Sequence, residues 1–156
     1  MIKIFNYQEL YEYYQQNKDS IKAIRYGYYT ICNDGGYSCR DFERYYCYLV
    51  NGIIVHITKV WWNKKCMWLD NKLVTSLNYS STNPEFKGLG YAKAVLTKLV
   101  EDIKEADLSL YMSIYTEEGF NTIAKTIDRL CKEYKVELWD GTLHSDKVYK
   151  SYHLNK

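Results

Sequence analysis

One proline and two glycines lie just ahead of a predicted helix, and these residue types suit the binding of an anion. Pro84, Gly88 and Gly90 fall within NPEFKGLGYAKAVLTKLVEDIKEA, although the 156-residue chain has one proline and eight glycines in all. The first amides of a helix have no acceptor within the helix, and aligned peptide dipoles add positive potential there. Glycines carry no Cβ, so such a turn can approach a phosphate closely. The segment is a candidate phosphate-binding turn.

The spacing does not fit two common phosphate-binding motifs. A Walker loop ends in Gly-Lys-Ser or Gly-Lys-Thr, whereas here Lys93 is followed by Ala94. A dinucleotide-binding turn needs a third glycine where Lys93 stands, and it opens a βαβ unit. The strands predicted before this turn form a hairpin instead. A plain strand-to-helix connection is the structural alternative.

Hydrophobic patterns predict the elements that position this turn. A strand is predicted at Ile2 to Phe5, and Asn6 with Glu9 can form a capping box that opens a helix. Ser20 is a candidate cap for a second short helix that ends at Gly27. Asn51-Gly52 separates two strand-like runs and predicts a tight hairpin. A third strand is expected from Leu73 to Thr82, directly before the turn.

The remaining elements complete one α/β domain over residues 1–156. The helix after the glycines has a core-facing stripe, which is Ala92, Val95, Leu96, Leu99, Val100 and Ile103. It is followed by a strand around Leu108 to Tyr115, a helix from about Glu118 to Glu133, and two closing strands near 135–139 and 147–153. The pattern contains no internal repeat or linker.

Composition narrows the class of protein. The net charge of +2 does not indicate a nucleic-acid or membrane surface, and no apolar run reaches the length of a membrane span. Five cysteines without a C-x-x-C pair predict buried free thiols and no metal site. The N-terminus lacks the features of a signal peptide. We expect a cytoplasmic domain.

The turn and its flanks resemble the acyl-CoA-binding motif of the GNAT superfamily, the GCN-related N-acetyltransferases. The family pattern is [R/Q]-x-x-G-x-[G/A], and this chain has Lys87, Gly88, Leu89, Gly90, Tyr91 and Ala92, with Pro84-Glu85-Phe86 before them. Lys87 keeps the positive charge of the usual arginine but loses its planar fork. The resemblance implies that backbone amides from Leu89 through Lys93 bind the diphosphate of acetyl-CoA or another acyl-CoA.

The resemblance also implies the fold and the rest of the cofactor site. The predicted order of elements matches a GNAT-like α/β (α+β) domain, with a mixed, mostly antiparallel sheet of about six to seven strands and about four helices. In this family strands four and five splay apart and the pantetheine arm lies between them. That arrangement would place five residues of the fourth strand along the arm, which are Leu77, Asn78, Tyr79, Ser80 and Thr82. Asn121 and Ala124 reproduce an N-x-x-A spacing that contacts the arm in relatives.

Catalytic residues are less clearly marked. Many relatives carry a carboxylate on the fourth strand as base, whereas this chain has Ser76 near that position. The general acid of the family, a tyrosine after the helix alanine, would be displaced to Tyr134 or supplied by Tyr115, or be absent. His56 on the second hairpin strand is a further candidate base, because imidazole has a pKa near ~6.5. Direct attack by an amine that loses its proton through water is an alternative.

The sequence therefore predicts an acyl-CoA-dependent N-acyltransferase, most simply an N-acetyltransferase that acts by direct attack in a ternary complex. The alternative is a GNAT-fold module with little or no activity that binds CoA or a protein. The acceptor would be an amine-bearing small molecule or a protein lysine. The many aromatic side chains would also allow a homodimer. The acceptor itself is not determined by the sequence.

Overall fold

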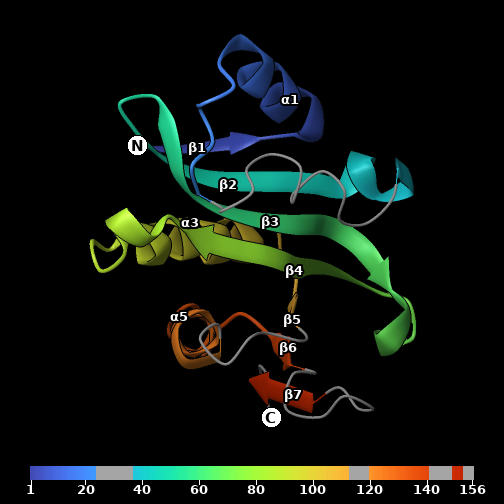
Figure 1. The fold of residues 1–156 in the computed structure, drawn as a ribbon. Coiled ribbons are helices and arrows are strands. Elements are labelled where there is room, and N and C mark those ends of the chain that lie inside the picture. The colour runs from blue at the N-terminus through green and yellow to red at the C-terminus, as the bar shows by residue number, and fades with distance from the viewer. Residues whose placement is uncertain (24–36, 113–119, 141–148, 153–156) are drawn as a thin grey trace. The chain divides into compact units, whose positions relative to one another are not determined.

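The computed structural model describes residues 1–23, 37–112, 120–140 and 149–152, and Figure 1 shows their arrangement. The chain forms two compact units. The first unit comprises Met1–Trp61 and Asn78–Val95, and the second comprises Trp62–Leu77 and Leu96–Lys156. Three long elements belong partly to each unit, and these are β3 (Ile53–Cys66), β4 (Lys72–Thr82) and α3 (Tyr91–Glu105). The prediction of a single domain stays a prediction.

The described strands form a mixed sheet in which they follow one another in chain order. The shorter strands are β1 (Ile2–Phe5), β2 (Glu43–Val50), β5 (Leu110–Met112), β6 (Leu138–Asp140) and β7 (Tyr149–Tyr152). β2 pairs antiparallel with β1 and β3, β5 pairs parallel with β4 and β6, and β6 pairs antiparallel with β7. The predicted mixed α/β fold is confirmed.

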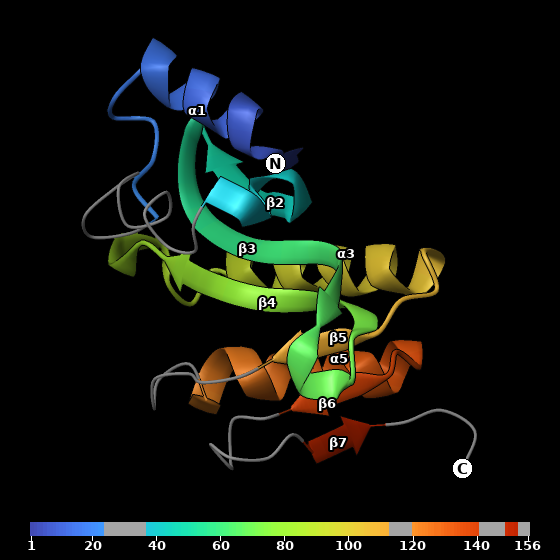
Figure 2. The ribbon, with the colours of Figure 1, turned by 90° about the vertical axis from the view of Figure 1, so that its right-hand side faces the viewer.

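β3 and β4 are longer than the sequence pattern suggested. They run side by side in both ribbon views (Figures 1 and 2). β3 continues past the predicted end at Val60 to Cys66, with Asn63 at a positive φ of 51°. The described β4–β5 ladder ends at the pair Leu77 and Met112, while β4 itself continues to Thr82. β4 therefore extends beyond its described pairing with β5, on the side toward the glycine turn.

The described residues contain three α-helices, which are α1 (Tyr7–Gln16), α3 and α5 (Lys125–Tyr134). The predicted capping box at α1 is confirmed, because the Asn6 side chain accepts from the Glu9 amide and the Glu9 carboxylate accepts from the Asn6 amide. A π-helical turn, Phe120–Ala124, leads directly into α5. The predicted stripe of α3 is buried from Val95 to Ile103.

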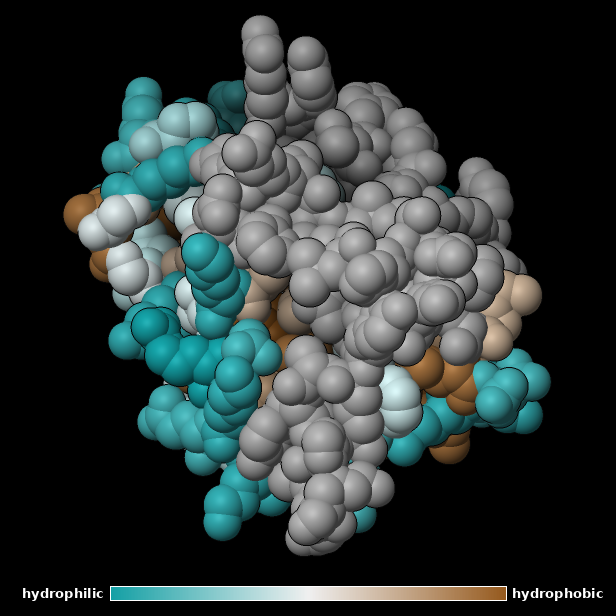
Figure 3. Space-filling model, turned by 90° about the horizontal axis from the view of Figure 1, so that it is seen from below, coloured by the Kyte–Doolittle hydropathy of each residue, from teal (hydrophilic) through white to brown (hydrophobic). Residues whose placement is uncertain are grey.

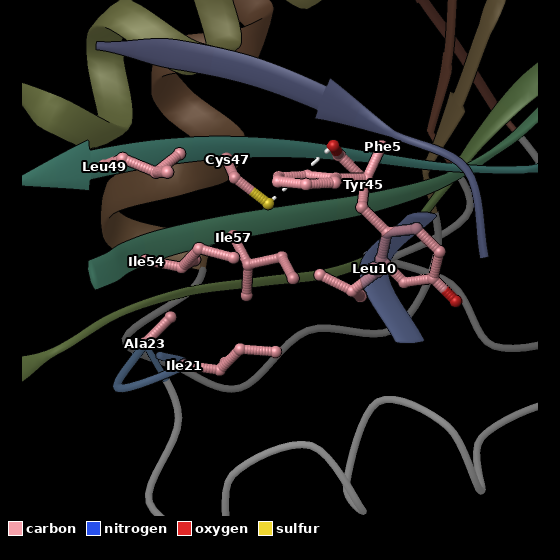
Figure 4. Packing of buried hydrophobic residues seen from close by; sticks show 9 residues of the cluster. All are labelled: Phe5, Leu10, Ile21, Ala23, Tyr45, Cys47, Leu49, Ile54 and Ile57. Atoms are coloured by element: carbon pink, nitrogen blue, oxygen red, sulfur yellow. Dashed lines mark hydrogen bonds between the residues drawn. The ribbon is translucent and has the colours of Figure 1, made fainter. Parts of the chain in front are cut away.

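The core of the first unit packs α1 against β1, β2 and β3. Figure 4 shows its nine buried members, which are Phe5, Leu10, Ile21, Ala23, Tyr45, Cys47, Leu49, Ile54 and Ile57. Burying an aliphatic or aromatic side chain of this size contributes about 1.5–3 kcal/mol. The cluster thus accounts for much of the stability of the unit that carries the glycine turn.

A buried ion pair lies in the same unit. The Lys59 Nζ atom lies 3.3 Å from the Glu43 Oε1 atom, and the two side chains are only 1% and 3% exposed. The Tyr45 hydroxyl donates to the other carboxylate oxygen of Glu43. Charges are tolerated at this depth because they are paired and hydrogen-bonded.

The helix predicted to begin at Ser20 is wrong in its described part. Ile21 forms a parallel bridge with Ile54, and the Ile54 amide donates to the Ser20 carbonyl over 2.7 Å. Ile21 and Ala23 are buried in the core of the first unit. An extended backbone brings both side chains into this core, and tertiary packing therefore overrides the local capping signal. Residues 24–27 lie outside the described part of the chain.

The second unit has its own buried residues. Cys66, Val74 and Tyr111 form one cluster, and the inner face of α5 buries Ile127, Leu130 and Cys131. The outer face of α5 is charged, and Figure 3 shows hydrophilic surface over this helix. Cys47, Cys66 and Cys131 are buried free thiols, as expected. Burial raises the pKa of the Cys131 thiol to about 12, so the reactive thiolate is scarce at neutral pH.

Candidate functional site

The strand that leads into the glycine turn ends at a well-anchored residue, Asn83. Its amide donates to the Val55 carbonyl over 2.8 Å, and its side-chain amide donates to the Lys22 carbonyl over 2.6 Å. Its side-chain oxygen accepts from the Glu85 amide over 2.9 Å and caps the 3₁₀ turn Pro84–Phe86. These contacts fix the start of the turn to β3 and to the segment before residue 24.

The turn itself is open. Gly88 and Gly90 have φ of +80° and +84°, a region that favours glycine, and no described heavy atom lies within 4 Å of a Cβ built on either. Leu89 between them is 59% exposed. Glycine is therefore needed for the backbone conformation, and the adjacent space can admit a ligand.

α3 begins immediately after the turn. The Ala94 amide donates to the Gly90 carbonyl over 3.0 Å, which makes Gly90 the residue at the helix cap. The amides of the first turn of an α-helix have no acceptor inside the helix. This first turn holds no acidic side chain that would compete with a bound anion. Exposed Lys87 and Lys93 flank the amides and add positive charge.

Aromatic rings lie beside the helix start. The rings of Tyr48 on β2 and Tyr91, the first residue of α3, are stacked with centroids 4.1 Å apart and an interplanar angle of 18°. Phe86 lies 6.3 Å from Tyr91, tilted by 35°. All three side chains are half-buried. The end of the glycine turn is therefore tied to the sheet through a ring contact.

The end of β4 presents its residues to two environments. Ser80 and Thr82 face Thr58 and His56 on β3, whereas Tyr79 packs against the core of the first unit. Asn78 lies on the Ser80 face by strand alternation. Its side-chain oxygen is buried and accepts no hydrogen bond from the described residues. The predicted pantetheine-binding residues of the first unit thus lie on one accessible strand end, where all are half-buried.

His56 is part of a buried hydrogen-bonded chain. Its Nδ1 atom lies 2.6 Å from the Thr82 hydroxyl and its Nε2 atom lies 2.8 Å from the Thr58 hydroxyl, which in turn lies 2.8 Å from the Ser80 hydroxyl. Burial lowers the pKa of His56 to about 4, so the ring is neutral at physiological pH. These contacts give His56 a structural role, and its role as a catalytic base stays a prediction.

The other catalytic candidates belong to the second unit. Ser76 is half-buried on β4 opposite Tyr111 of β5. Tyr134 is the last residue of α5, and desolvation together with the charges of Glu101 and Glu133 raises its pKa, which keeps its phenol protonated. Tyr115 lies outside the described residues.

The π-helical turn before α5 contains the predicted N-x-x-A pair. Asn121 lies in this turn, and Ala124, its last residue, is 5% exposed. π-helical turns are rare and occur frequently at functional sites. The roles of both residues in cofactor binding stay predictions.

Two residues at the turn were missed by the sequence reasoning. The dipeptide Asn83-Pro84 is a known turn signal and could have identified Asn83 as an anchor. Tyr48 carries no such signal, because its contact with Tyr91 depends on how β2 and α3 pack. Neither residue belongs to the family motif.

No family model and no curated protein sequence matches the chain. Solved structures do match. The aminoglycoside N-acetyltransferase AAC(6')-Iy, in complex with a CoA bisubstrate analogue, is 15% identical, with 88% of this chain and 90% of that chain covered and a TM-score of 0.52. The ribosomal-protein-alanine N-acetyltransferase of Brucella melitensis biovar Abortus 2308 is 14% identical, with 80% and 89% covered and a TM-score of 0.52.

The chain has the GNAT fold. A third match with this architecture is a probable N-acyltransferase from Enterococcus faecalis V583, which is 12% identical with a TM-score of 0.53. The match covers 78% of this chain but 30% of that longer chain. Identities this low show the fold alone. The GNAT fold places the glycine turn of this chain between the fourth strand and the following helix, as the motif predicted.

Two further observations concern the described residues only. None of their helices is both long and apolar enough to cross a bilayer. Within the same ranges, no group of three or more His, Cys, Asp or Glu side chains could hold a metal ion.

Proposed function

We propose that the protein transfers an acyl group, most simply acetyl, from acyl-CoA to a primary amine. The open glycine turn carries this proposal, because it joins β4 to a 15-residue helix in a GNAT fold. The turn fits a diphosphate, since Gly88 and Gly90 leave empty the space that a Cβ would fill. When bound, acyl-CoA supplies an activated thioester, and the chain holds and orients it.

The residues that would hold acyl-CoA follow from the turn and the strand before it. The amides from Leu89 to Lys93 donate to the diphosphate oxygens, and Lys87 adds positive charge beside them. The strand end from Leu77 to Thr82 lies along the pantetheine arm. Asn121 and Ala124 would contact the same arm. The sum of these contacts positions the thioester, and positioning is a large part of the catalysis of acyl transfer.

The chain offers few groups for proton transfer. Tyr134 or Tyr115 protonates the leaving thiolate, and the raised pKa of Tyr134 suits an acid that must hold its proton until then. β4 has no carboxylate from Lys72 to Thr82, so Ser76 or His56 would have to assist the amine. Otherwise the neutral amine attacks directly and loses its proton to water.

Thermal unfolding with acetyl-CoA, free CoA and NAD tests the proposal first. We expect both CoA species to raise the midpoint and NAD to leave it unchanged, because NAD lacks the pantetheine arm. A thiol-release assay with acetyl-CoA and amines then tests turnover. No stabilisation by either CoA species would refute the proposed function.

The alternative function is a CoA-binding or protein-binding module with little activity. The absence of a carboxylate on β4 favours it. Stabilisation by CoA without thiol release from polyamines, amino acids or lysine peptides would support this alternative. Stabilisation with release would support the enzyme.

The acceptor class is a primary amine on a small molecule or a protein. Matching structures are named as acting on aminoglycosides and on a ribosomal-protein alanine. Both are amines of moderate to large size. A panel that contains an aminoglycoside, a polyamine and a lysine peptide therefore covers the proposed range.

A further inference from the structure

We infer that Tyr48, a strand residue outside the glycine turn, is a positioning residue for the diphosphate of acyl-CoA and acts through its stacked partner Tyr91. This inference rests on the proposed function. Tyr48 belongs to β2, whereas the turn joins β4 to α3. The residue therefore acts from the sheet, and it would shape the site without contacting the reacting atoms.

The geometry of the pair supports this role. The rings are 4.1 Å apart and nearly parallel, at 18°, and Tyr91 directly follows Gly90. A fixed Tyr91 ring fixes the backbone of the first turn of α3, where the amides that would bind the diphosphate begin. Phe86 lies near the same ring, 6.3 Å away. The Tyr91 side chain is thus held by the sheet and by the segment before the glycines.

The platform under Tyr91 is itself rigid. Tyr48 pairs with Ile2 of β1 and with His56 of β3, so strands flank it on both sides. His56 bonds to Thr82, which lies two residues before Pro84. The strand that enters the turn and the ring at its end are therefore tied to adjacent positions of one sheet.

The glycine turn needs such anchors more than an ordinary turn does. Gly88 and Gly90 have no described heavy atom within 4 Å of a Cβ position, and Leu89 is largely exposed. Packing within the turn therefore restrains it little. Asn83 fixes its start and Tyr91 fixes its end. Fixing a binding loop before the ligand arrives lowers the entropy cost of binding.

The test compares ligands with and without the diphosphate. In Tyr48→Ala we expect the Kd for CoA and the KM for acetyl-CoA to rise about tenfold, with kcat at saturation unchanged. With S-acetyl-pantetheine, which lacks the diphosphate, kcat/KM should stay within about twofold of wild type. Tyr48→Phe keeps the ring and should restore wild-type values. Equal losses with both acyl donors would show a merely structural role and refute the inference.

A control variant and a backbone measurement complete the test. Tyr13→Ala removes the Phe5–Tyr13 ring pair of the same unit, away from the glycine turn, and should leave CoA affinity unchanged. Amide hydrogen exchange from residue 88 to 92 should quicken in Tyr48→Ala and not in Tyr13→Ala. If Tyr48→Ala does not fold, Tyr48→Leu takes its place with the same expectations.

The outcomes separate the inference from the proposed function. A wild-type protein that does not bind CoA refutes the proposed function, and the inference with it. A wild-type protein that binds CoA while Tyr48→Ala binds it equally well refutes the inference alone. A loss confined to acyl donors with the diphosphate, rescued by Tyr48→Phe, supports both.

Discussion

Two turns in the described part of the chain place glycine at positive φ, and they differ in their surroundings. Gly52, in the β2–β3 hairpin, has φ of +79°, and a Cβ there would lie 3.6 Å from the Tyr13 hydroxyl. Gly88 and Gly90 have similar φ values but no described heavy atom within 4 Å. The backbone needs glycine in both turns. Only the second turn also keeps its backbone accessible, which is what a binding turn requires.

The largest expected effect comes from a carboxylate placed in each turn. Gly90→Glu should weaken CoA binding at least about 100-fold, because it removes charge-assisted hydrogen bonds, each contributing about 1.5–3 kcal/mol, and adds a like charge. Gly52→Glu is the matched control, since it imposes the same backbone strain of about 1–2 kcal/mol. Calorimetric titration with CoA measures both. Equal loss in the two variants would remove the distinction between the turns.

The second effect concerns the strand that connects the two turns, because His56 follows the hairpin and bonds to Thr82 before the open turn. Its pKa is about 4 in the folded state and 6.5 in its absence. Between these values the unfolded state binds the proton and the folded state does not. The free energy of unfolding should therefore fall as the pH drops from about 6.5 to about 4, by roughly 3 kcal/mol in all.

Urea unfolding of wild type and His56→Gln across this pH range isolates the contribution, since other groups titrate in both proteins. The difference in unfolding free energy between the two should shrink as the pH falls. A constant difference from pH 7 to pH 4 would mean that the His56 ring is not held neutral in the folded state. CoA affinity at pH 5 should fall with the same midpoint if the open turn depends on this chain of hydroxyls.

The smallest effect comes from the side chains that anchor each turn. Asn83→Ala loses the bonds to Lys22 and Glu85 and should lower the free energy of unfolding by about 1–2 kcal/mol and weaken CoA binding several-fold. Tyr13→Phe loses the hydroxyl that donates to the Gly52 carbonyl and should cost about 1 kcal/mol without changing CoA affinity. Denaturant melts with CoA titrations measure both. Weaker CoA binding in Tyr13→Phe would contradict the separation of the turns.

Local chemistry predicted the elements whose signals are local. The Asn6–Glu9 capping box, the Asn51-Gly52 hairpin and the stripe of α3 are confirmed. Each depends on residues within a few positions of one another. The glycine turn was found for the same reason, because its spacing and its following helix are contiguous in the sequence.

Features that depend on distant pairing were not predictable in this way. Ile21 bridges Ile54, and this contact across the chain overrides the helix signal at Ser20. The stack of Tyr48 on Tyr91 depends on strand register, and the complete burial of His56 depends on both neighbouring strands. The site is therefore readable from sequence at the turn, whereas its support from the sheet is not.

The buried ion pair of Glu43 and Lys59 links two positions in the history of the protein. Loss of either partner alone would leave an uncompensated buried charge, which typically costs about 3–5 kcal/mol. Joint replacement by apolar residues of similar volume is often neutral or better. Substitutions at these positions should therefore appear together among homologues and rarely singly. The pair would serve as an internal marker of shared ancestry for chains whose overall identity has fallen to the level seen here.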